Sequence, residues 1–326
     1  MNGSPLARVI LGCTQAGVRP SPEHLELMNP HLQAAPSAVD GSRPASDPGA
    51  SRILVAITAH YLPSRVIYLS QVLRSFAAYP VADLHVCIFT TGNTDEQAIL
   101  ARLARETLQE VTFEVVAPEA LQSTLDLPWS SKELITSRFM KDGYYSHFIY
   151  VEDDLPISYE NFCYFLDGRE RLRDIGLLPS FLRVEYNDSL LGFVSLDNSH
   201  VISVSDSPHV IFDDFIFTNV PNPYCACFIL DQELAVEYAG SASFDQVRSA
   251  SVYAWGVLER AAMGLCFENI PAGFRSRWVI PVSRRSGLPA SRAWIPHLPN
   301  NYTNQEDLKW AKTRMDSLIG DVTGLD

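Results

Sequence analysis

Strand-like and helix-like segments alternate through residues 52–155, and this alternation constrains the fold more than any other feature of the sequence. Apolar runs that predict strands buried on both faces occupy residues 53–58, 84–90, 111–116 and 146–151. Amphipathic patterns between them predict helices over residues 65–79, 94–108 and 131–144. Repeats of this kind form a mostly parallel α/β sheet with helices on both faces. The carboxyl ends of the strands then share one edge, where open α/β sheets bind their ligands.

The sequence on either side of this region has a different character. Residues 1–51 are rich in Pro, Ser, Ala and Gly and lack a hydrophobic period, so we predict a disordered N-terminal tail. After residue 155 the regular alternation is lost. The elements expected there are a helix over 160–173, short strands between 190 and 230, helices near 232–238 and 246–263, and a strand at 266–270.

We therefore expect one folded domain over residues 52–305. Its first half, 52–155, contains the parallel strands, and its mixed α+β second half, 156–305, is expected to extend the same sheet with antiparallel strands. Residues 306–326 are predicted to form a C-terminal helix or tail.

Composition excludes several classes of function. The formal net charge of −13 argues against a nucleic-acid partner, because phosphate backbones are bound by an excess of Lys and Arg. No apolar run approaches the roughly 20 residues of a transmembrane helix, and none near the start is long enough for a secretory signal, so we expect a cytoplasmic protein without a transmembrane segment. The 6 cysteines lie mostly in apolar stretches, which favours free thiols over disulfides.

The acidic run Glu152-Asp153-Asp154 directly follows the fourth predicted strand, at the edge where ligands gather. Adjacent carboxylates repel one another, and a bound divalent cation removes that penalty. Hard oxygen ligands suit Mg²⁺ or Mn²⁺, which also accept substrate phosphates. The alternative is a solvated turn, which Leu155-Pro156 favours. The metal interpretation gains weight because the chain has neither GxGxxG after the first strand nor GxxxxGK[ST] anywhere.

The segment Phe148-Ile149-Tyr150-Val151-Glu152-Asp153-Asp154 resembles the Asp-x-Asp segment of GT-A glycosyltransferases, in the form Glu-Asp-Asp. The resemblance covers about residues 52–300 and does not select a family within the class. It implies a GT-A-like, Rossmann-type fold in which residues 52–155 bind the nucleotide sugar and residues 156–305 bind the acceptor. It also implies that Glu152 and Asp154 hold Mn²⁺ or Mg²⁺, while Asp153 contacts the donor.

Two later segments are similar to parts of the same layout. Tyr253-Ala254-Trp255-Gly256-Val257-Leu258-Glu259 resembles the segment that carries an acceptor-activating carboxylate, which implies that Glu259 is the catalytic base. The acidic pair common there is missing, since Arg260 follows, and a surface Glu paired with a basic neighbour is the alternative. Trp294-Ile295-Pro296-His297 resembles the C-terminal segment that supplies a His to the metal or diphosphate, and the alternative for His297 is a structural role.

Residues 269–305 contain no Asp or Glu but five Arg. Arg suits bidentate contact with phosphate, so we expect Arg275, Arg284 and Arg285 to neutralise a leaving diphosphate on a loop that closes over the donor. The alternative is a solvated basic patch. The other donor-binding candidates lie at strand ends or just before the fourth strand and are His60, Arg65, Thr91, Asn93, Arg138 and Asp142.

These features together predict a divalent-metal-dependent glycosyltransferase. It would move a sugar from a nucleotide-diphosphate donor to a hydroxyl of a carbohydrate or glycolipid-precursor acceptor. A nucleotidyltransferase acting on sugar phosphates is one alternative, although Thr58-Ala59-His60-Tyr61-Leu62-Pro63 lacks the Gly-rich activating loop of that class. A non-catalytic nucleotide- or carbohydrate-binding protein of the same fold is the other.

Overall fold

The computed structural model describes residues 47–119, 121–141, 143–320 and 322, so Asp142 and most of the expected N-terminal tail lie outside the described residues. The first described element is the short 3₁₀ helix η1 (Pro48–Ala50), which the side chain of Asp47 caps. Ser51 after it is buried. The folded region therefore begins a few residues before the boundary predicted from composition.

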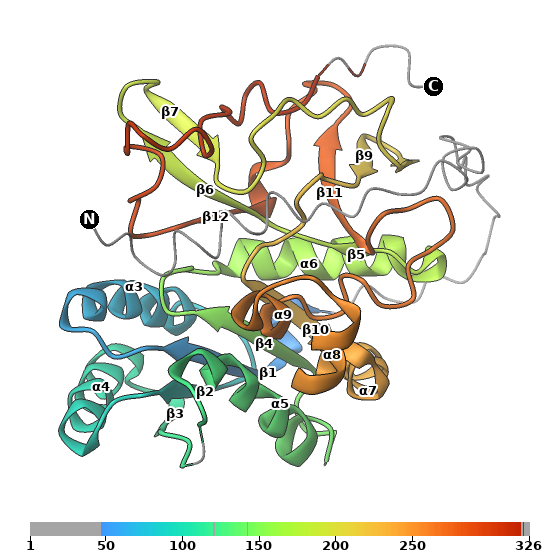
Figure 1. The fold of residues 1–326 in the computed structure, drawn as a ribbon. Coiled ribbons are helices and arrows are strands. Elements are labelled where there is room, and N and C mark those ends of the chain that lie inside the picture. Colours follow the sequence, from blue (N-terminus) through green and yellow to red (C-terminus); the bar gives the residue numbers. More distant parts are fainter. Residues whose placement is uncertain (1–46, 120, 142, 321, 323–326) are drawn as a thin grey trace.

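The main sheet has five strands in the order β10-β4-β1-β2-β3. Four of them are parallel and come from the first half of the chain: β1 (Arg52–Ala59), β2 (Asp83–Thr90), β3 (Thr112–Val116) and β4 (His147–Glu152). The fifth, β10 (Cys227–Asp231), pairs antiparallel with β4. The mostly parallel α/β sheet predicted from the sequence is thus confirmed (Figure 1).

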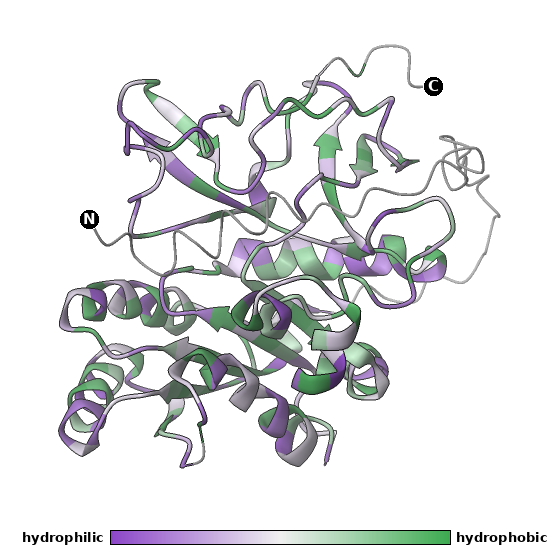
Figure 2. Cartoon of the chain, viewed as in Figure 1, coloured by the Kyte–Doolittle hydropathy of each residue, from purple (hydrophilic) through white to green (hydrophobic). Residues whose placement is uncertain are grey.

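Helices cover the main sheet and bury its apolar strands. They are α3 (Val66–Ala77), α4 (Thr94–Leu108), α5 (Ser130–Leu134) with its π-helical continuation η4 (Ile135–Phe139), α6 (Tyr159–Leu172) and α7 (Gln232–Gly240). The continuous apolar run of β1 is buried from its second residue to its last, as expected for a central parallel strand. Figure 2 shows the apolar residues concentrated along these strands and the inner sides of the helices.

Most strands of the second half do not extend the main sheet, so that part of the prediction is wrong. They form a four-stranded sheet, β5-β11-β9-β8, and a three-stranded sheet, β12-β6-β7. Their bounds are β5 (Leu178–Pro179), β6 (Leu182–Asn187), β7 (Gly192–Ser195), β8 (His209–Phe212), β9 (Phe215–Thr218), β11 (Trp278–Ser283) and β12 (Trp294–Pro296). Since β10 takes the edge beside β4, the other strands pair with one another. Figure 1 shows α6 between the main sheet and these smaller sheets.

Several local predictions in the second half also fail. The helix expected over 246–263 is two helices, α8 (Gln246–Val252) and α9 (Val257–Ala262), because Tyr253 is extended and Gly256 caps a new helix. Residues 266–270 form turns rather than a strand. The described residues after 305 form turns instead of a helix, and Met315 and Leu318 pack into a second core with strands of the small sheets.

Lys132 is an unusual feature of the core, since its side chain is buried among aromatic rings. Its Nζ donates hydrogen bonds to the Tyr238 hydroxyl at 2.5 Å and to the Ala261 carbonyl at 2.7 Å. The same atom lies within 6 Å of the ring centroids of four aromatic residues, Trp129, Tyr150, Phe228 and Tyr238. Burial lowers the pKa of Lys132 well below its usual value, because the charged form loses its hydration.

Replacing Lys132 by Met is expected to remove one pH-dependent contribution to stability. The native pKa of Lys132 lies below 10.5 while the unfolded chain keeps the usual value, so the unfolded chain binds more protons between these two values. The free energy of unfolding of the wild type should therefore rise with pH relative to that of Lys132→Met in this window. Urea unfolding of both proteins at about pH 7 and about pH 9.5 measures the difference, and a constant difference would contradict the prediction.

Within the part of the chain that the structure describes, no helix has the length and hydropathy needed to cross a bilayer. The five described cysteines are free thiols, as predicted, and four of them are buried. Cys13 lies outside the described residues.

Candidate functional site

The acidic run lies where the carboxyl ends of two central strands meet. Glu152 ends β4 and is paired in register with Thr58 of β1. The backbone N–H of Asp153 donates to the Thr58 carbonyl at 3.1 Å, and the Asp154 carbonyl accepts from the N–H of Leu298 at 3.0 Å. Asp153 and Asp154 are only 3% and 4% exposed. The run is therefore a fixed, buried turn, which rules out the solvated turn considered from the sequence.

Arg65 supplies positive charge to this turn. It ends the 3₁₀ helix η2 (Pro63–Arg65), which follows β1 and leads into α3. Its guanidinium bonds both carboxyl oxygens of Asp153, with Nε 3.2 Å from Oδ2, and its Nη2 lies 2.7 Å from Oδ2 of Asp154. One cation thus bridges two adjacent carboxylates and offsets part of their mutual repulsion.

His297 approaches Asp154 from the opposite side. It follows β12, and its Nε2 lies 3.4 Å from Asp154 Oδ2 while its Nδ1 lies 2.6 Å from Glu185 Oε1. Glu185, on β6, also accepts from the backbone N–H groups of Tyr302 and Thr303. Burial lowers the pKa of His297, but its hydrogen bonds to Asp154 and Glu185 outweigh burial and raise the pKa above its usual value. Glu185 therefore orients the ring so that Nε2 faces the acidic run.

Glu152 faces an aromatic and a basic side chain. Its Oε1 accepts from the Tyr224 hydroxyl at 3.3 Å, and the Arg183 guanidinium lies 4.7 Å from the centroid of the Tyr224 ring. Arg183 is held by two hydrogen bonds to Asp197. Burial, followed by the charge of Asp154, raises the pKa of Glu152 to about 7.

The three carboxyls therefore differ in their affinity for protons. Burial raises the pKa of Asp153 to about 6 despite its bonds to Arg65. Burial also acts to raise the pKa of Asp154, but its partners His297 and Arg65 hold that pKa below the usual range. Asp154 is thus the most firmly ionised member of the run.

The site fits a hard divalent cation by one specific observation. Oδ1 of Asp154 is a buried carboxylate oxygen without a hydrogen-bond partner among the described residues, although Oδ2 contacts Arg65 and His297. An unpartnered anionic oxygen beside further carboxylates is the arrangement that Mg²⁺ or Mn²⁺ ligands adopt. Asp154 and His297 are in contact, but among the described residues the ligand atoms of Glu152, Asp154 and His297 do not all lie within 4.8 Å of one another, so their shared role as metal ligands stays a prediction.

Glu259 lies in the first turn of α9 and is 8% exposed. No described residue gives its Oε2 a hydrogen-bond partner. Arg260 does not bond to it and instead contacts the Trp255 carbonyl at 2.7 Å and Ser249 Oγ at 3.1 Å. The alternative of a surface ion pair is therefore wrong, because Glu259 is buried and the guanidinium of Arg260 bonds Ser249 and Trp255 instead.

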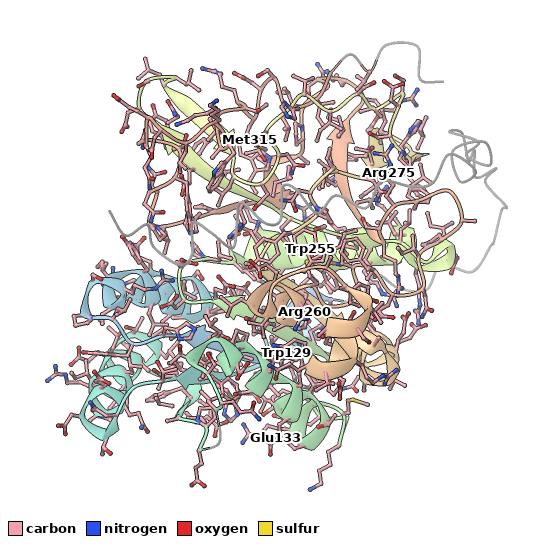
Figure 3. The ribbon with its side chains drawn as sticks, in the orientation of Figure 1. Trp129, Glu133, Trp255, Arg260, Arg275 and Met315 are labelled. Atoms are coloured by element: carbon pink, nitrogen blue, oxygen red, sulfur yellow. The ribbon has the colours of Figure 1, made fainter. Side chains whose placement is uncertain are left out.

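Tyr224 connects Glu259 with the acidic run. Burial raises the pKa of its hydroxyl, Glu152 raises it further, and Glu259 adds to this against the effect of Arg183. The Tyr224 ring stacks on Trp255, with centroids 6.3 Å apart and an interplanar angle of 23°. Figure 3 labels Trp255 and Arg260 near α9. Tyr224 thus contacts both Glu152, at the end of β4, and Trp255, shortly before α9.

The donor-binding candidates fall into two groups. His60 and Arg65 line a hollow of about 180 Å³ together with Asp153, directly beside the acidic run. Thr91 and Asn93 follow β2 at the same edge of the sheet, since Thr90 is paired with Ala59 of β1. Their contact with a donor stays a prediction.

Asn93 has a structural role as well. It is the N-cap of α4, and its Oδ1 accepts from the N–H groups of Asp95 and Glu96. We expect Asn93→Ala to lower the free energy of unfolding by about 1 kcal/mol, as measured by urea denaturation, and Asn93→Asp to keep it. If the alanine variant is as stable as the wild type, the cap contributes nothing.

The remaining Arg candidates lie elsewhere in this structure. Arg138, on η4, pairs with Glu114 of β3. Arg275, Arg284 and Arg285 are exposed around the small sheets, where Arg275 contacts the Asp206 carbonyl and Arg284 contacts the Asp213 carbonyl. In Figure 3, Arg275 lies near β9 and β11, away from Trp255. The structure does not bring these four to the acidic run, and their role with a donor remains a prediction.

Sequence reasoning missed Glu185, Arg183 and Tyr224. A carboxylate between apolar residues of a predicted strand was the available signal for Glu185. Nothing comparable marks Tyr224, which reaches Glu152 from 72 residues away.

No protein-family model matches the chain, and no curated protein matches its sequence. Among solved structures, S. aureus TarS residues 1–349 is 15% identical, with a TM-score of 0.28 over 40% of this chain and 36% of that chain. The mannosyltransferase PcManGT from Pyrobaculum calidifontis, in complex with GDP-Man and Mn²⁺, is 13% identical, with a TM-score of 0.36 over 65% of this chain and 57% of that chain.

A third structure, CMP:2-keto-3-deoxy-manno-octonic acid synthetase complexed with CTP, is 12% identical, with a TM-score of 0.32 over 62% of this chain and 83% of that chain. The chain thus spans less than two thirds of TarS and of PcManGT. By the order and direction of its own strands, the chain has a mostly parallel α/β fold of the Rossmann type.

Proposed function

We propose that this chain is a glycosyltransferase that moves a sugar from a nucleotide-diphosphate donor to a hydroxyl acceptor and depends on Mn²⁺ or Mg²⁺. The observation that carries the proposal is the buried, unpartnered Oδ1 of Asp154 in the acidic run at the carboxyl end of β4, with His297 in contact with the other oxygen of the same carboxylate. A divalent cation bound there would neutralise the diphosphate that leaves as the sugar departs.

The residues around the acidic run suit the two ends of a donor. The small hollow lined by His60, Arg65 and Asp153 adjoins the run, on the side where the nucleoside of a donor would lie. Arg65 offers a planar guanidinium with several N–H donors, which suits phosphate oxygens as well as carboxylates. Its present partners, Asp153 and Asp154, hold it at the mouth of this hollow.

Glu259 is the proposed base. Its unpartnered Oε2 can accept the proton of an acceptor hydroxyl as that oxygen attacks the anomeric carbon. Burial shields Glu259 from bulk water, and Tyr224, which bonds Glu152, stacks on Trp255 just before α9. The acceptor, a carbohydrate or glycolipid precursor, would then lie on the side of α9.

Calorimetric titration of UDP and GDP into the purified chain tests the donor site. We expect one nucleotide to bind in the presence of Mn²⁺ and to bind at least about 10-fold more weakly without it, because the cation bridges protein carboxylates and the diphosphate. If neither UDP nor GDP binds, with or without Mn²⁺, the assignment of the donor site is overturned. If a nucleotide binds, but no acceptor of a panel causes release of that nucleotide from its sugar conjugate, the chain is a non-catalytic binding protein.

A further inference from the structure

A second group of ligand-type side chains lies on the β2–β3 edge of the main sheet, apart from the acidic run. His85 and Cys87 are on β2, and Glu114 is on β3, directly opposite Cys87 in the register. His85 precedes Cys87 by two residues, so both side chains leave the same face of the strand. One ligand atom from each of the three lies within 4.8 Å of the other two.

The imidazole of this group is already oriented. The Tyr145 hydroxyl lies 3.2 Å from Nδ1 of His85, which leaves Nε2 directed at the other two side chains. Nε2 is 3.5 Å from Glu114 Oε1, and the Cys87 thiol donates to the same oxygen at 2.7 Å. A hydrogen bond on the distal nitrogen is the usual way in which a metal-binding His is fixed.

The guanidinium of Arg138 lies close to the ligand atoms of all three side chains. Nη1 of Arg138 lies 2.5 Å from Glu114 Oε1, 3.2 Å from His85 Nε2 and 3.5 Å from Cys87 Sγ. The Arg138 side chain is 36% exposed and comes from the π-helical turn η4, so it can leave for solvent without opening the core. The group therefore has a cation site with an exchangeable occupant.

We infer that His85, Cys87 and Glu114 bind a Zn²⁺-type transition-metal ion, which takes the place of the Arg138 guanidinium. A nitrogen, a sulfur and a carboxylate oxygen form a donor set for a borderline-soft ion rather than for Mg²⁺ or Mn²⁺. Three protein ligands leave a fourth tetrahedral position for water.

The geometry requires only small adjustments. Bonds of about 2.0–2.3 Å in a tetrahedral site place ligand atoms about 3.3–3.5 Å apart. The distance between His85 Nε2 and Glu114 Oε1 already matches, and the distance between Cys87 Sγ and Glu114 Oε1 must increase by under about 1 Å. On binding, the Cys87 S–H bond breaks, its proton goes to solvent and a sulfur–metal bond forms, with no change in oxidation state. The ion would join the edge strand β3 to β2.

Titration of the metal-stripped full chain with Co²⁺, a spectroscopic substitute for Zn²⁺, tests this inference. We expect one equivalent to produce the thiolate-to-cobalt charge-transfer band in the near ultraviolet, and Zn²⁺ to displace it. The band should vanish in Cys87→Ala and persist in the matched control Cys163→Ala, whose thiol is on α6. No thiolate band in the wild type, or an equal band in Cys87→Ala, would overturn the inference.

Two further variants separate a metal site from a polar network. Arg138→Ala removes the competing charge and should raise the Zn²⁺ affinity at least about 10-fold by calorimetry, whereas Glu114→Gln should lower it by about 10–100-fold. Glu114 is 36% exposed, so its variant gives an answer even if Cys87→Ala fails to fold. Unchanged affinity in both variants would overturn the inference. Asp154→Asn should leave the cobalt band intact, which keeps this result independent of the proposed transferase activity.

Discussion

Sugar transfer by Asp154→Asn is expected to fall by about 10³-fold, the upper end of what one electrostatic partner of a developing charge contributes. The substitution keeps the shape of the side chain but removes the charge that faces His297 and Arg65, together with the unpartnered buried oxygen. Nucleotide binding that depends on Mn²⁺ should disappear at the same time, because the cation loses the most firmly ionised carboxylate of the acidic run.

The measurements for this variant are calorimetry with UDP or GDP with and without Mn²⁺, and a transfer assay with whichever donor the wild type accepts. Asp213→Asn is the matched control, since Asp213 lies in the exposed β8–β9 turn, where its side chain is 82% exposed. The control should match the wild type in both assays. Metal-dependent nucleotide binding that survives in Asp154→Asn would remove this residue from the donor site.

The second large effect is expected for Glu259→Gln. A general base contributes about 10²–10⁴-fold to the rate, so kcat should fall by that factor while the affinity for nucleotide and Mn²⁺ stays unchanged. Because Oε2 of Glu259 has no hydrogen-bond partner in the described parts of the chain, the free energy of unfolding should change by less than about 1 kcal/mol.

This separation of effects distinguishes catalysis from folding. Steady-state kinetics, nucleotide calorimetry and urea unfolding are measured on Glu259→Gln and on Glu170→Gln, whose exposed side chain is on α6. Only the first variant should lose kcat. A normal kcat in Glu259→Gln would refute its role as base, and a parallel loss of stability and nucleotide binding would show that the residue is structural.

The first half of the fold could be predicted because its signals are local. β1, β2 and β4 are largely apolar runs, and each crossover helix has its own hydrophobic period, so the elements of residues 52–155 can be predicted without knowledge of distant partners. The strands of the second half are short, and their pairing depends on segments far apart, such as β6 with β12. The hydrophobic pattern of a short strand does not specify which distant strand it pairs with, so the sequence does not predict the two small sheets.

The candidate site divides in the same way. The acidic run is contiguous in sequence, and the strand before it marks its position at the sheet edge. Glu185 and Tyr224 reach the run from other strands, so their proximity exists only after folding. Arg138 is a different case: its place before β4 suggests a donor contact, which stays a prediction, while in this structure its side chain contacts His85 of β2 and Glu114 of β3.

The parallel pairing of β6 with β12 has a consequence for how the protein is made. Glu185 and His297 are 112 residues apart, and β12 joins β6 only after all the intervening chain has been synthesised. Contacts of such long range form late, because loop closure must precede them. A nascent chain on the ribosome can complete the parallel sheet and Glu152-Asp153-Asp154 well before His297 emerges. The contact between Glu185 and His297 therefore forms only after residue 297 has been synthesised, and a chain that stops before it would lack one side of the candidate site.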